Sequence, residues 1–259
     1  MKFIHFIFLF SGTVIANCNE NWEHLQKIES ANTYVVKNKS FFYFYPFEKY
    51  KSESLFLIKG DNFHSYFKSN DYIFGSYIRT NGSVVSGWLK AETLVGSSSK
   101  SHYYPPEVSK SDFVIISPYK NIELGSSYEQ FYKKWGKCEI NKQPDIGISG
   151  NFLAKGDETY KYFDHFWKGF TIRSSNINYQ LTGMDYNYYR ITTIAINSNK
   201  YMTSRGITIG DTTDNMFASY GKPFNLDKVQ VIYKFKSNTL SFDINNGVVE
   251  RIVMDEQAE

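Results

Sequence analysis

The sequence predicts a small all-β barrel followed by an α+β domain of two tandem units, each a helix followed by an antiparallel meander. Three observations lead to this prediction. Aromatic and β-branched runs alternate with turn residues over residues 33–94. Serine, glycine and proline gather over residues 95–111, as in a linker. A motif in residues 122–138 recurs without gaps in residues 207–223, within a domain that we place at residues 112–255.

Length and composition bound what the chain can be. Its 259 residues are 42% hydrophobic and 21% charged, and its formal net charge is +3. This length is enough for one or two domains with cores of their own, and the composition excludes a disordered polyelectrolyte. Because nucleic-acid-binding domains carry clustered positive charge, the small net charge argues against a nucleic-acid partner.

Residues 1–16 have the three parts of a secretory signal peptide. A basic start, Met1-Lys2, precedes an apolar run over residues 3–10, and the small residues Val14 and Ala16 suit a cleavage site. The run is well short of the ~20 apolar residues that cross a bilayer, which disfavours a membrane anchor. We therefore expect export to the periplasm or the exterior, with no transmembrane segment in the mature chain.

Cys18 and Cys138 are the only cysteines, and exported proteins meet an oxidising compartment. We expect them to form a disulfide, which would close a loop of about 120 residues and stabilise the fold by at most about 4–5 kcal/mol. Two buried free thiols are the alternative, and a count of thiols in the denatured, unreduced protein distinguishes the two. A lipid anchor at Cys18 is disfavoured because Asn17 stands where a lipidation signal has a small residue.

The N-terminal region predicts strand after strand. Residues 19–30 precede it and favour a short helix or turn. Asn81-Gly82 lies between two runs, and this dipeptide is the strongest short signal of a β-hairpin because both residues tolerate positive φ. The expected strands are residues 34–36, 41–45, 54–58, 63–67, 72–78 and 84–89.

Two dipeptides in this region carry a resemblance. Gly60-Asp61 ends the string 55–61, and Gly87-Trp88 closes the hairpin that follows. Together they resemble bacterial SH3-like domains over residues 33–94. The resemblance implies an SH3-like barrel in which Gly60, Asp61, Gly87 and Trp88 are structural motif residues.

The repeated motif predicts one capped helix in each copy. Ser126 and Asp211 are expected N-caps, and Glu129 and Asp214 lie three residues later, the capping-box spacing. Apolar residues follow at helical spacing in both copies. The two copies share two pairs of glycines, Gly125 with Gly210 and Gly136 with Gly221. Gly136 and Gly221 are expected to end the helices.

Strands are expected after each helix, which gives units at about residues 118–200 and 203–255. Asn245-Asn246-Gly247 predicts a hairpin turn between the last two strands. The expected strands are residues 160–163, 169–173 and 188–196 in the first unit, and 229–235, 239–244 and 248–254 in the second.

Each copy of the motif has Ile, Gly, a capping residue, an aromatic residue and Gly-Lys in this order, and a meander follows. This pattern resembles the tandem units of β-lactamase-inhibitor-protein-like domains. Outer-membrane assembly lipoproteins have a related α+β unit. The resemblance covers residues 118–254. It implies an exported, non-enzymatic module that binds a protein partner with the face of its sheet, and it carries over no contact residue.

The sequence offers little that could catalyse a reaction. Its histidines lack the spacing of a metal pair, and it has no Gly-x-Ser-x-Gly motif or phosphate-binding glycine loop. A Cys138–His165 catalytic pair is disfavoured, since Cys138 aligns with Pro223 at a helix exit. Asp255-Glu256 is interpreted as part of a frayed tail. We therefore expect no catalytic residue, no metal and no cofactor.

The excess of aromatic residues suggests a protein-binding surface, because Tyr, Trp and Arg carry much of the energy at interfaces. A basic rim would suit an acidic partner; the alternative is that tyrosine serves simply as a strand former. The expected partner-binding residues are Trp167, Tyr186, Tyr188, Tyr189, Arg173 and Arg190.

Two functions remain open from the sequence. The first is a periplasmic inhibitor or immunity-type protein that occludes a protein partner, possibly a secreted hydrolase or toxin, through an aromatic sheet face. The alternative is an envelope protein that binds peptidoglycan through its SH3-like barrel. An enzyme is a distant third.

Overall fold

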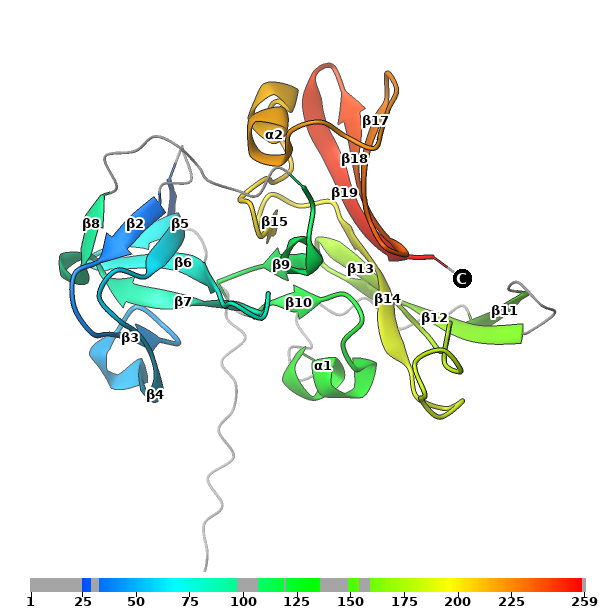
Figure 1. Ribbon diagram of the computed structural model, residues 1–259, viewed down its shortest axis with the longest axis horizontal. Helices are drawn as coiled ribbons and strands as arrows, with labels where there is room; N and C mark the ends of the chain where they lie inside the picture. Colours follow the sequence, from blue (N-terminus) through cyan, green and yellow to red (C-terminus); the bar gives the residue numbers. More distant parts are fainter. Residues whose placement is uncertain are drawn as a thin grey trace, which may run out of the picture.

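The computed structural model describes residues 25–28, 33–96, 107–118, 120–135, 149–153 and 159–257. In these residues the protein is mostly β, built from antiparallel sheets, with two α-helices (Figure 1). The predicted signal segment 1–16, the Cys18–Cys138 disulfide, Gly136 and most of the predicted linker lie outside the described residues.

The N-terminal strands form a curved sheet, which we call the half-barrel. Its strand order is β4-β3-β7-β6-β5-β2-β8, with β1 beside β5. The strands are β1 (Gln26–Lys27), β2 (Thr33–Val36), β3 (Ser40–Tyr43), β4 (Lys51–Leu57), β5 (Asn62–Ser69), β6 (Tyr72–Ile78), β7 (Val84–Lys90) and β8 (Leu94–Gly96), with the 3-10 turns η2 (Glu48–Tyr50) and η3 (Ala91–Thr93).

All six strands predicted in this region are confirmed, with three corrections. The prediction of a helix or turn over residues 19–30 is wrong for residues 26–27, which pair with Phe67 and Lys68 of β5. That pairing comes from a strand about 40 residues away, so no local signal could reveal it. The strand predicted over residues 41–45 corresponds to β3, which ends at Tyr43, so Phe44 and Tyr45 lie in the following loop. β8 was not predicted.

The SH3-like motif residues hold turns and close contacts in the half-barrel. The Asp61 carboxylate accepts a hydrogen bond from the Ile58 N–H at 2.8 Å and so closes the β4–β5 turn. A Cβ on Gly87 would come within 2.8 Å of the Phe42 ring, so this position requires glycine for β7 to approach β3. Trp88 is buried.

The C-terminal region is an eight-stranded antiparallel sheet with the order β11-β12-β13-β14-β19-β18-β17-β16. Its strands are β11 (Ser149–Leu153), β12 (Thr159–Trp167), β13 (Phe170–Ser175), β14 (Arg190–Ile196), β16 (Asn225–Leu226), β17 (Gln230–Phe235), β18 (Asn238–Asn245) and β19 (Val248–Glu256), and its helices are α1 (Tyr128–Trp135) and α2 (Thr213–Tyr220). Both helices and the six C-terminal strands agree with the prediction to within a few residues, whereas β11 and β16 were not predicted. The expected frayed tail at Asp255-Glu256 is wrong, because β19 continues to Glu256.

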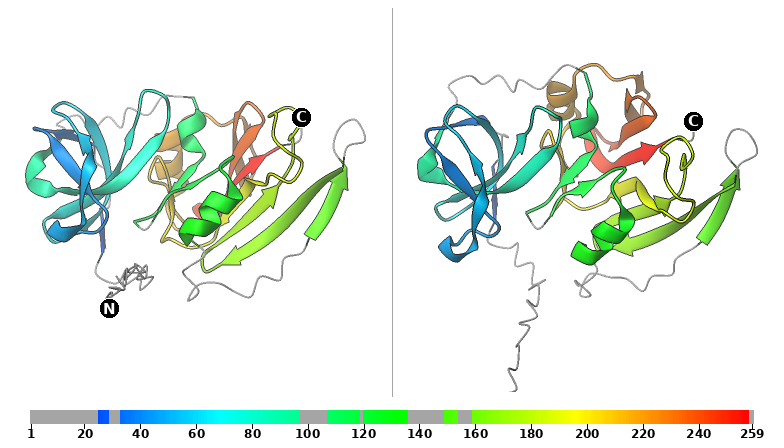
Figure 2. Two further views of the ribbon diagram at one scale, coloured as in Figure 1. Left: turned by 90° about the horizontal axis from the view of Figure 1, so that it is seen from below. Right: turned by 60° about the horizontal axis from the view of Figure 1, so that its bottom comes forward.

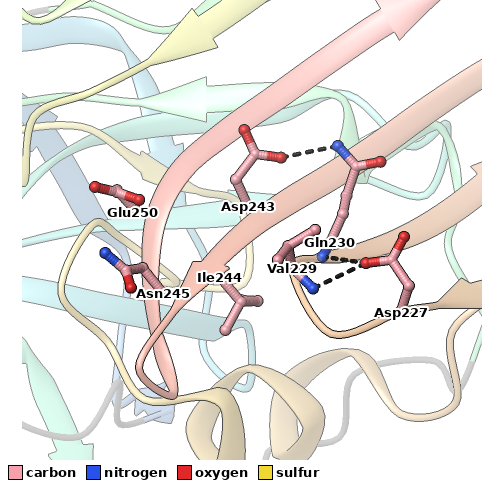
Figure 3. Close-up of a pocket in the computed structure, with 7 residues that line it drawn as sticks. All are labelled: Asp227, Val229, Gln230, Asp243, Ile244, Asn245 and Glu250. Carbon is pink, nitrogen blue, oxygen red and sulfur yellow. Dashed lines mark hydrogen bonds between the residues drawn. The ribbon is translucent and has the colours of Figure 1, made fainter.

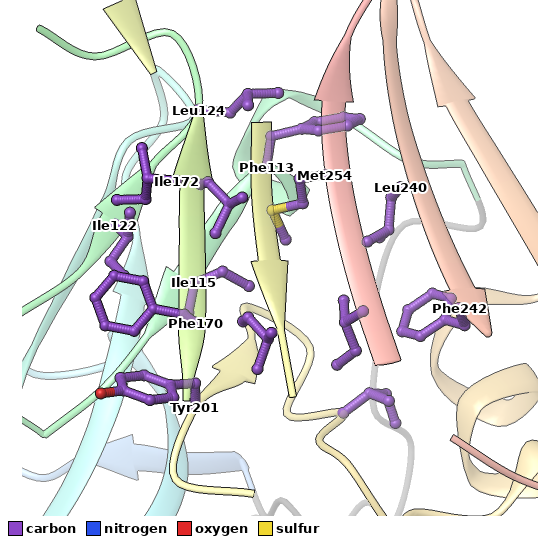
Figure 4. Close-up of a cluster of buried hydrophobic side chains, with 14 of the residues drawn as sticks. Phe113, Ile115, Ile122, Leu124, Phe170, Ile172, Tyr201, Leu240, Phe242 and Met254 are labelled. Carbon is purple, nitrogen blue, oxygen red and sulfur yellow. The ribbon is translucent and has the colours of Figure 1, made fainter. Parts of the chain in front are cut away.

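A small central sheet joins the two regions. It consists of β10 (Ile122–Glu123), β9 (Val114–Ile116) and β15 (Met202–Thr203), and it is preceded by the 3-10 turn η4 (Lys110–Asp112). Val114 and Ile116 of β9 pack with half-barrel residues, whereas Ile115 packs into the core of the large sheet (Figure 4). Both faces of β9 are therefore buried, and Tyr66 of the half-barrel also donates a hydrogen bond to the Ser204 carbonyl at 2.7 Å.

The beginning of each helix is bonded to the last strand of its half of the sheet in the same way. The Gly125 N–H donates to the Ile191 carbonyl (2.7 Å), as the Gly210 N–H does to that of Val249 (2.8 Å). The Ile191 N–H donates to the Ser126 carbonyl (2.8 Å), as the Val249 N–H does to that of Asp211 (2.9 Å). The Tyr128 N–H donates to the Tyr189 carbonyl (3.1 Å), as the Thr213 N–H does to that of Gly247 (3.0 Å).

The predicted N-caps are wrong by one residue. Thr212 caps α2, because its hydroxyl accepts from the Asn215 N–H, and Ser127 accepts from the Gln130 N–H in the same way at α1. Asp211 is instead engaged by the Thr208 N–H and by Lys27. At the other end, Gly221 has a φ of 67° and ends α2 as predicted. Neither helix of the described residues is long and apolar enough to cross a membrane.

Candidate functional site: the uncovered sheet face

The two faces of the eight-stranded sheet differ in what covers them. Inward side chains of β13, β14, β17, β18 and β19 form the core with α1, α2 and the central sheet (Figure 4). On the other face, the side chains are partly buried or exposed, apart from the buried Ala195, Tyr160 and Ser175, and the described layers lie on the core side (Figure 2). This uncovered face carries Tyr162, Asp164, Phe166, Thr171, Arg173, Thr193, Val253, Asp255, Thr239, Ser241 and Ile232.

The sheet is bent where β14 meets β19. In Figure 1, β17 and β18 run toward one end and β11 and β12 toward the other, while α1 and α2 lie on the outer side of the bend. The uncovered face is on the inner side. A partner surface would therefore meet side chains from both halves of the sheet.

An ion pair lies near the middle of the β12–β13 half. Arg173 donates to Asp164 through Nε (2.7 Å to Oδ1) and Nη2 (2.9 Å to Oδ2), a fork-to-fork geometry that fixes both side chains. The guanidinium also lies 4.4 Å from the ring centroid of Tyr162. The hydrogen bonds to Asp164 raise the pKa of Arg173. The result is a rigid polar group that remains 42% exposed at the arginine side chain.

A second acidic group lies where the two halves join. Asp255 of β19 accepts a hydrogen bond from Thr193 of β14 at 2.6 Å, across the β14–β19 junction. Burial raises the pKa of Asp255, although the Thr193 hydrogen bond and the charge of Arg173 act in the opposite direction. The junction therefore presents a carboxylate whose charge is only partly compensated.

A shallow hollow of about 440 Å³ lies at the β18–β19 hairpin end (Figure 3). Three carboxylates line it, those of Asp227, Asp243 and Glu250, and Gln230 donates to Asp243 at 2.8 Å. The lining of the hollow is therefore acidic, although Lys228 and Arg251 follow Asp227 and Glu250 in the sequence. Among the described residues, no group of three His, Cys, Asp or Glu side chains is arranged to hold a metal ion.

The structure separates the six predicted partner-binding residues. Only Arg173 lies on the uncovered face. Trp167 points to the opposite side, where it is 6% exposed and packs against Phe131 and Phe170, so the expectation that it contacts a partner is wrong. Arg190 forms an ion pair with Glu256 at 2.6 Å that leaves its side chain 13% exposed.

The three predicted tyrosines lie in or next to the loop over residues 176–189, and all are partly buried. Tyr186 packs edge-on against Tyr179 (5.3 Å between ring centroids), and Tyr189 packs against Phe163 on the core side (5.3 Å). They do not form one aromatic surface with Arg173. Both arginines of the expected basic rim are paired with carboxylates, whereas its two lysines, Lys161 and Lys168, have no ion pair among the described contacts.

One buried chain of hydrogen bonds has the residue types of a catalytic site. His165 is bonded through Nδ1 to the Tyr128 hydroxyl (2.9 Å) and through Nε2 to the Ser174 hydroxyl (2.8 Å). Ser174 is only 1% exposed and His165 8%. This chain joins α1 to the covered face of the sheet, and no substrate could reach the serine oxygen in this arrangement.

Sequence reasoning missed Tyr162, Asp164, Thr193 and Asp255. The available signal was the alternation in β12, where Tyr162, Asp164 and Phe166 share one parity and His165 and Trp167 the other.

Comparison with known proteins gives no relative. No protein-family model matches the chain, and neither a curated protein nor a solved structure matches it.

Proposed function

We propose that the protein is an exported, non-enzymatic binding protein that occludes a protein partner with the uncovered face of its eight-stranded sheet. The observation that carries the proposal is this face itself: one side of the sheet is covered by helices and the central sheet, and the other presents ordered polar groups. Export is expected from residues 1–16 and is part of the proposal.

The size of the face suits a protein partner. Eight strands at about 4.8 Å spacing and about 17–20 Å length give a surface of roughly 600 Å². A partner in a standard interface buries about 800 Å². Loops beside the sheet can supply the remainder.

The groups on this face are already held in place. Arg173 is fixed by Asp164 and Asp255 by Thr193, so a partner would lose little side-chain freedom to bind them. The same pairing reduces the positive charge on which an acidic partner would depend. A partner with mixed polar contacts, and a basic group near Asp227, Asp243 and Glu250, fits better.

We also propose that α1 with β11–β14 and α2 with β16–β19 are two copies of one unit, related to β-lactamase-inhibitor-protein-like domains, and that the half-barrel is SH3-like. Support for the duplication comes from the matching helix–strand bonds, in which the residues on the helix side are offset by 85 residues, the same offset as in the repeated motif. A further pair agrees: Lys120 Nζ donates to the Lys134 carbonyl (3.2 Å), and Arg205 Nη1 to the Ser219 carbonyl (3.0 Å).

Photo-crosslinking in the envelope of producing cells tests the proposed binding face. A photoreactive residue at Thr171 or at Ser241 should give an adduct of defined mass with one protein, because both positions lie on the face. The same residue at Thr80, exposed in the β6–β7 turn, is the matched control and should give none. Adducts from Thr80 alone, or none from the face, would refute the proposal.

Affinity for the captured partner then measures the effect of blocking the face. T171R should weaken the complex at least about tenfold, since a bulky charge in the centre of an interface is poorly accommodated. T80R should leave affinity unchanged. Circular dichroism should show that both variants keep the fold.

The alternative, peptidoglycan binding by the half-barrel, gains no support from its motif residues. Gly60 and Asp61 form a turn, Gly87 approaches Phe42, and Trp88 is buried. It predicts co-sedimentation with purified sacculi that T171R does not change.

A further inference from the structure

The half-barrel exposes a cluster of aromatic and lysine side chains, which we call the aromatic–lysine surface. It comprises the end of β3, the loop with η2, and β4. Phe44 is 62% exposed and Phe47 56%, although phenylalanine is usually buried. The other members are Phe41, Tyr45, Tyr50, Phe56, Lys39, Lys49 and Lys51.

The rings of this surface form two adjacent groups. At the loop, the centroids of Tyr45 and Tyr50 are 4.8 Å apart, and those of Phe47 and Tyr50 are 6.4 Å apart. On the strands, Phe41 and Phe56 are 5.7 Å apart. Neighbouring rings therefore pack against one another, while Phe47 and Phe56 remain exposed.

Lysines surround both groups. Lys39 Nζ lies 4.0 Å from the Phe56 centroid, Lys51 Nζ 4.7 Å from that of Phe41, and Lys49 Nζ 5.0 Å from that of Tyr50. Each ammonium group thus rests on a ring and projects positive charge at the level of the apolar surface.

The nearby acidic groups do not cancel this charge. Glu48 is engaged by Lys90 at 2.9 Å and by the hydroxyls of Tyr43 and Tyr72. Glu53, exposed on β4, is the other carboxylate of the segment from Lys39 to Phe56. Three lysines therefore face one carboxylate that is not committed to another partner in the described contacts.

We propose that the aromatic–lysine surface docks the protein on an anionic lipid membrane. Phenylalanine and tyrosine rings favour the boundary between headgroups and acyl chains, and lysines beside them bind anionic headgroups while their stems cover apolar surface. Charge complementarity selects a negatively charged surface, and the rings add the apolar contact that a purely ionic partner would not use.

The position of the surface supports this occupant. The segment between β3 and β4, which holds the loop with η2, lies at the lower edge of the half-barrel in Figure 1, away from the eight-stranded sheet. Exposed rings on a protruding loop can enter a membrane interface without rearrangement of the fold. Docking there would leave the uncovered sheet face free, so this inference goes beyond the proposed function and does not depend on it.

Vesicle flotation tests the proposal. The protein beginning at Asn17 is used, so that the apolar run over residues 3–10 cannot itself insert. It should bind vesicles of phosphatidylglycerol and phosphatidylethanolamine at least about tenfold more tightly than vesicles of phosphatidylcholine, because about three lysines contribute only at an anionic surface. Added salt should weaken the binding to the anionic vesicles.

Paired variants separate the two contributions. F44S/F47S should lose at least about tenfold in affinity for the anionic vesicles, because two exposed rings can no longer enter the interface. K49Q/K51Q should lose about tenfold on these vesicles and change little on phosphatidylcholine. The matched control is F224S/K228Q, which removes a 72% exposed phenylalanine and an exposed lysine elsewhere and should bind like the parent protein.

Three outcomes would overturn the proposal: absence of binding to the anionic vesicles, equal binding by F44S/F47S, or a loss in F224S/K228Q as large as that in F44S/F47S. Binding to purified sacculi but not to vesicles would also overturn it and would instead favour a polysaccharide ligand. Thermal unfolding of each variant verifies that the exposed substitutions leave the fold intact.

Discussion

The two halves of the C-terminal sheet share backbone hydrogen bonds between the start of a helix and the last strand, but the side chains that pack them differ. In the α1 half, aromatic rings pack through the core, with Trp135 edge-to-face against Trp167 and Phe170. The α2 half has a ring cluster too, in which Tyr220 packs against Tyr233 and Phe242, but a buried ion pair also joins Arg205 to Asp112, and both of these side chains are 2% exposed. The two halves thus differ by a buried polar network that is added to the apolar packing of the α2 half.

The clearest difference lies at matching positions before each helix. Lys120 and Arg205 both donate to the carbonyl of the last but one helical residue. Arg205 is buried and also reaches Asp112 through two hydrogen bonds, whereas the Lys120 contact is exposed. The same backbone contact should therefore contribute very differently in the two halves.

Removing these two basic residues should give the largest contrast. R205M leaves the Asp112 carboxylate buried without its cation and should lower the free energy of unfolding by about 3–5 kcal/mol. K120M removes an exposed contact and should change it by no more than about 0.5 kcal/mol. Urea unfolding of both variants measures the contrast.

A double variant shows whether the uncompensated charge is the cause. D112A/R205M should recover part of the stability that R205M loses, because no buried charge is left unpaired. Equal losses in R205M and K120M, or a further loss in the double variant, would contradict this account.

The connections between the last two strands of each half provide a second contrast. The α2 half uses a tight turn in which Gly247 has a φ of 77°. The turn is held by the strand pairing of Asn245 with Val248 and by a hydrogen bond from the Thr213 N–H to the Gly247 carbonyl. The α1 half uses the longer loop over residues 176–189, where Gly183 has a φ of 65°.

Alanine at these two glycines should therefore have unequal effects. G247A forces a side chain into left-handed backbone within a fixed ladder and should cost about 1–2 kcal/mol. G183A should cost less than half as much, since a long loop can adjust its backbone. No atom lies within 4 Å of a Cβ at either position, so the difference reports backbone strain alone. Thermal unfolding measures it, and equal losses would show that the loop is as constrained as the turn.

Local patterns were enough to predict most elements of the fold. Strand alternation, Asn-Gly turns and the repeated helix stripe located both helices and most strands. The exact N-caps were not predictable, because Ser126 and Ser127 are both good caps, as are Asp211 and Thr212. At the second helix, other contacts engage Asp211: the Thr208 N–H, three residues away, and Lys27 of β1, which comes from a distant part of the chain.

The candidate site was less predictable for the same reason. The alternation of side chains along β12 and β13 places Trp167 and Arg173 on opposite faces of the sheet, but it does not say which face is covered. That is decided by β9, α1 and α2, which come from other parts of the chain. The aromatic–lysine surface was hidden in a run that sequence reasoning assigned to a strand, and the early end of β3 at Tyr43 brings Phe44 and Phe47 to the surface.

The smallest expected effect concerns Asp255, at the junction of the two halves. Burial raises its pKa in the folded protein above the unfolded value, so the folded state holds a proton more tightly than the unfolded state. The associated stability is present below the unfolded pKa and is lost as pH rises through the folded pKa. The Asp255 carboxylate should therefore be slightly destabilising at pH 7.

D255N tests this sign. Asparagine keeps an oxygen that can accept the Thr193 hydrogen bond but carries no charge at any pH. The variant should be more stable than the parent at pH 7, by at most about 1 kcal/mol, and this difference should shrink as pH falls below the ordinary aspartate range. D164N is the informative comparison, because Asp164 is paired with Arg173 and its loss should destabilise. A D255N variant less stable than the parent at pH 7 would mean that the attraction of Arg173 outweighs burial, and that the junction of the two halves is held by charge rather than weakened by it.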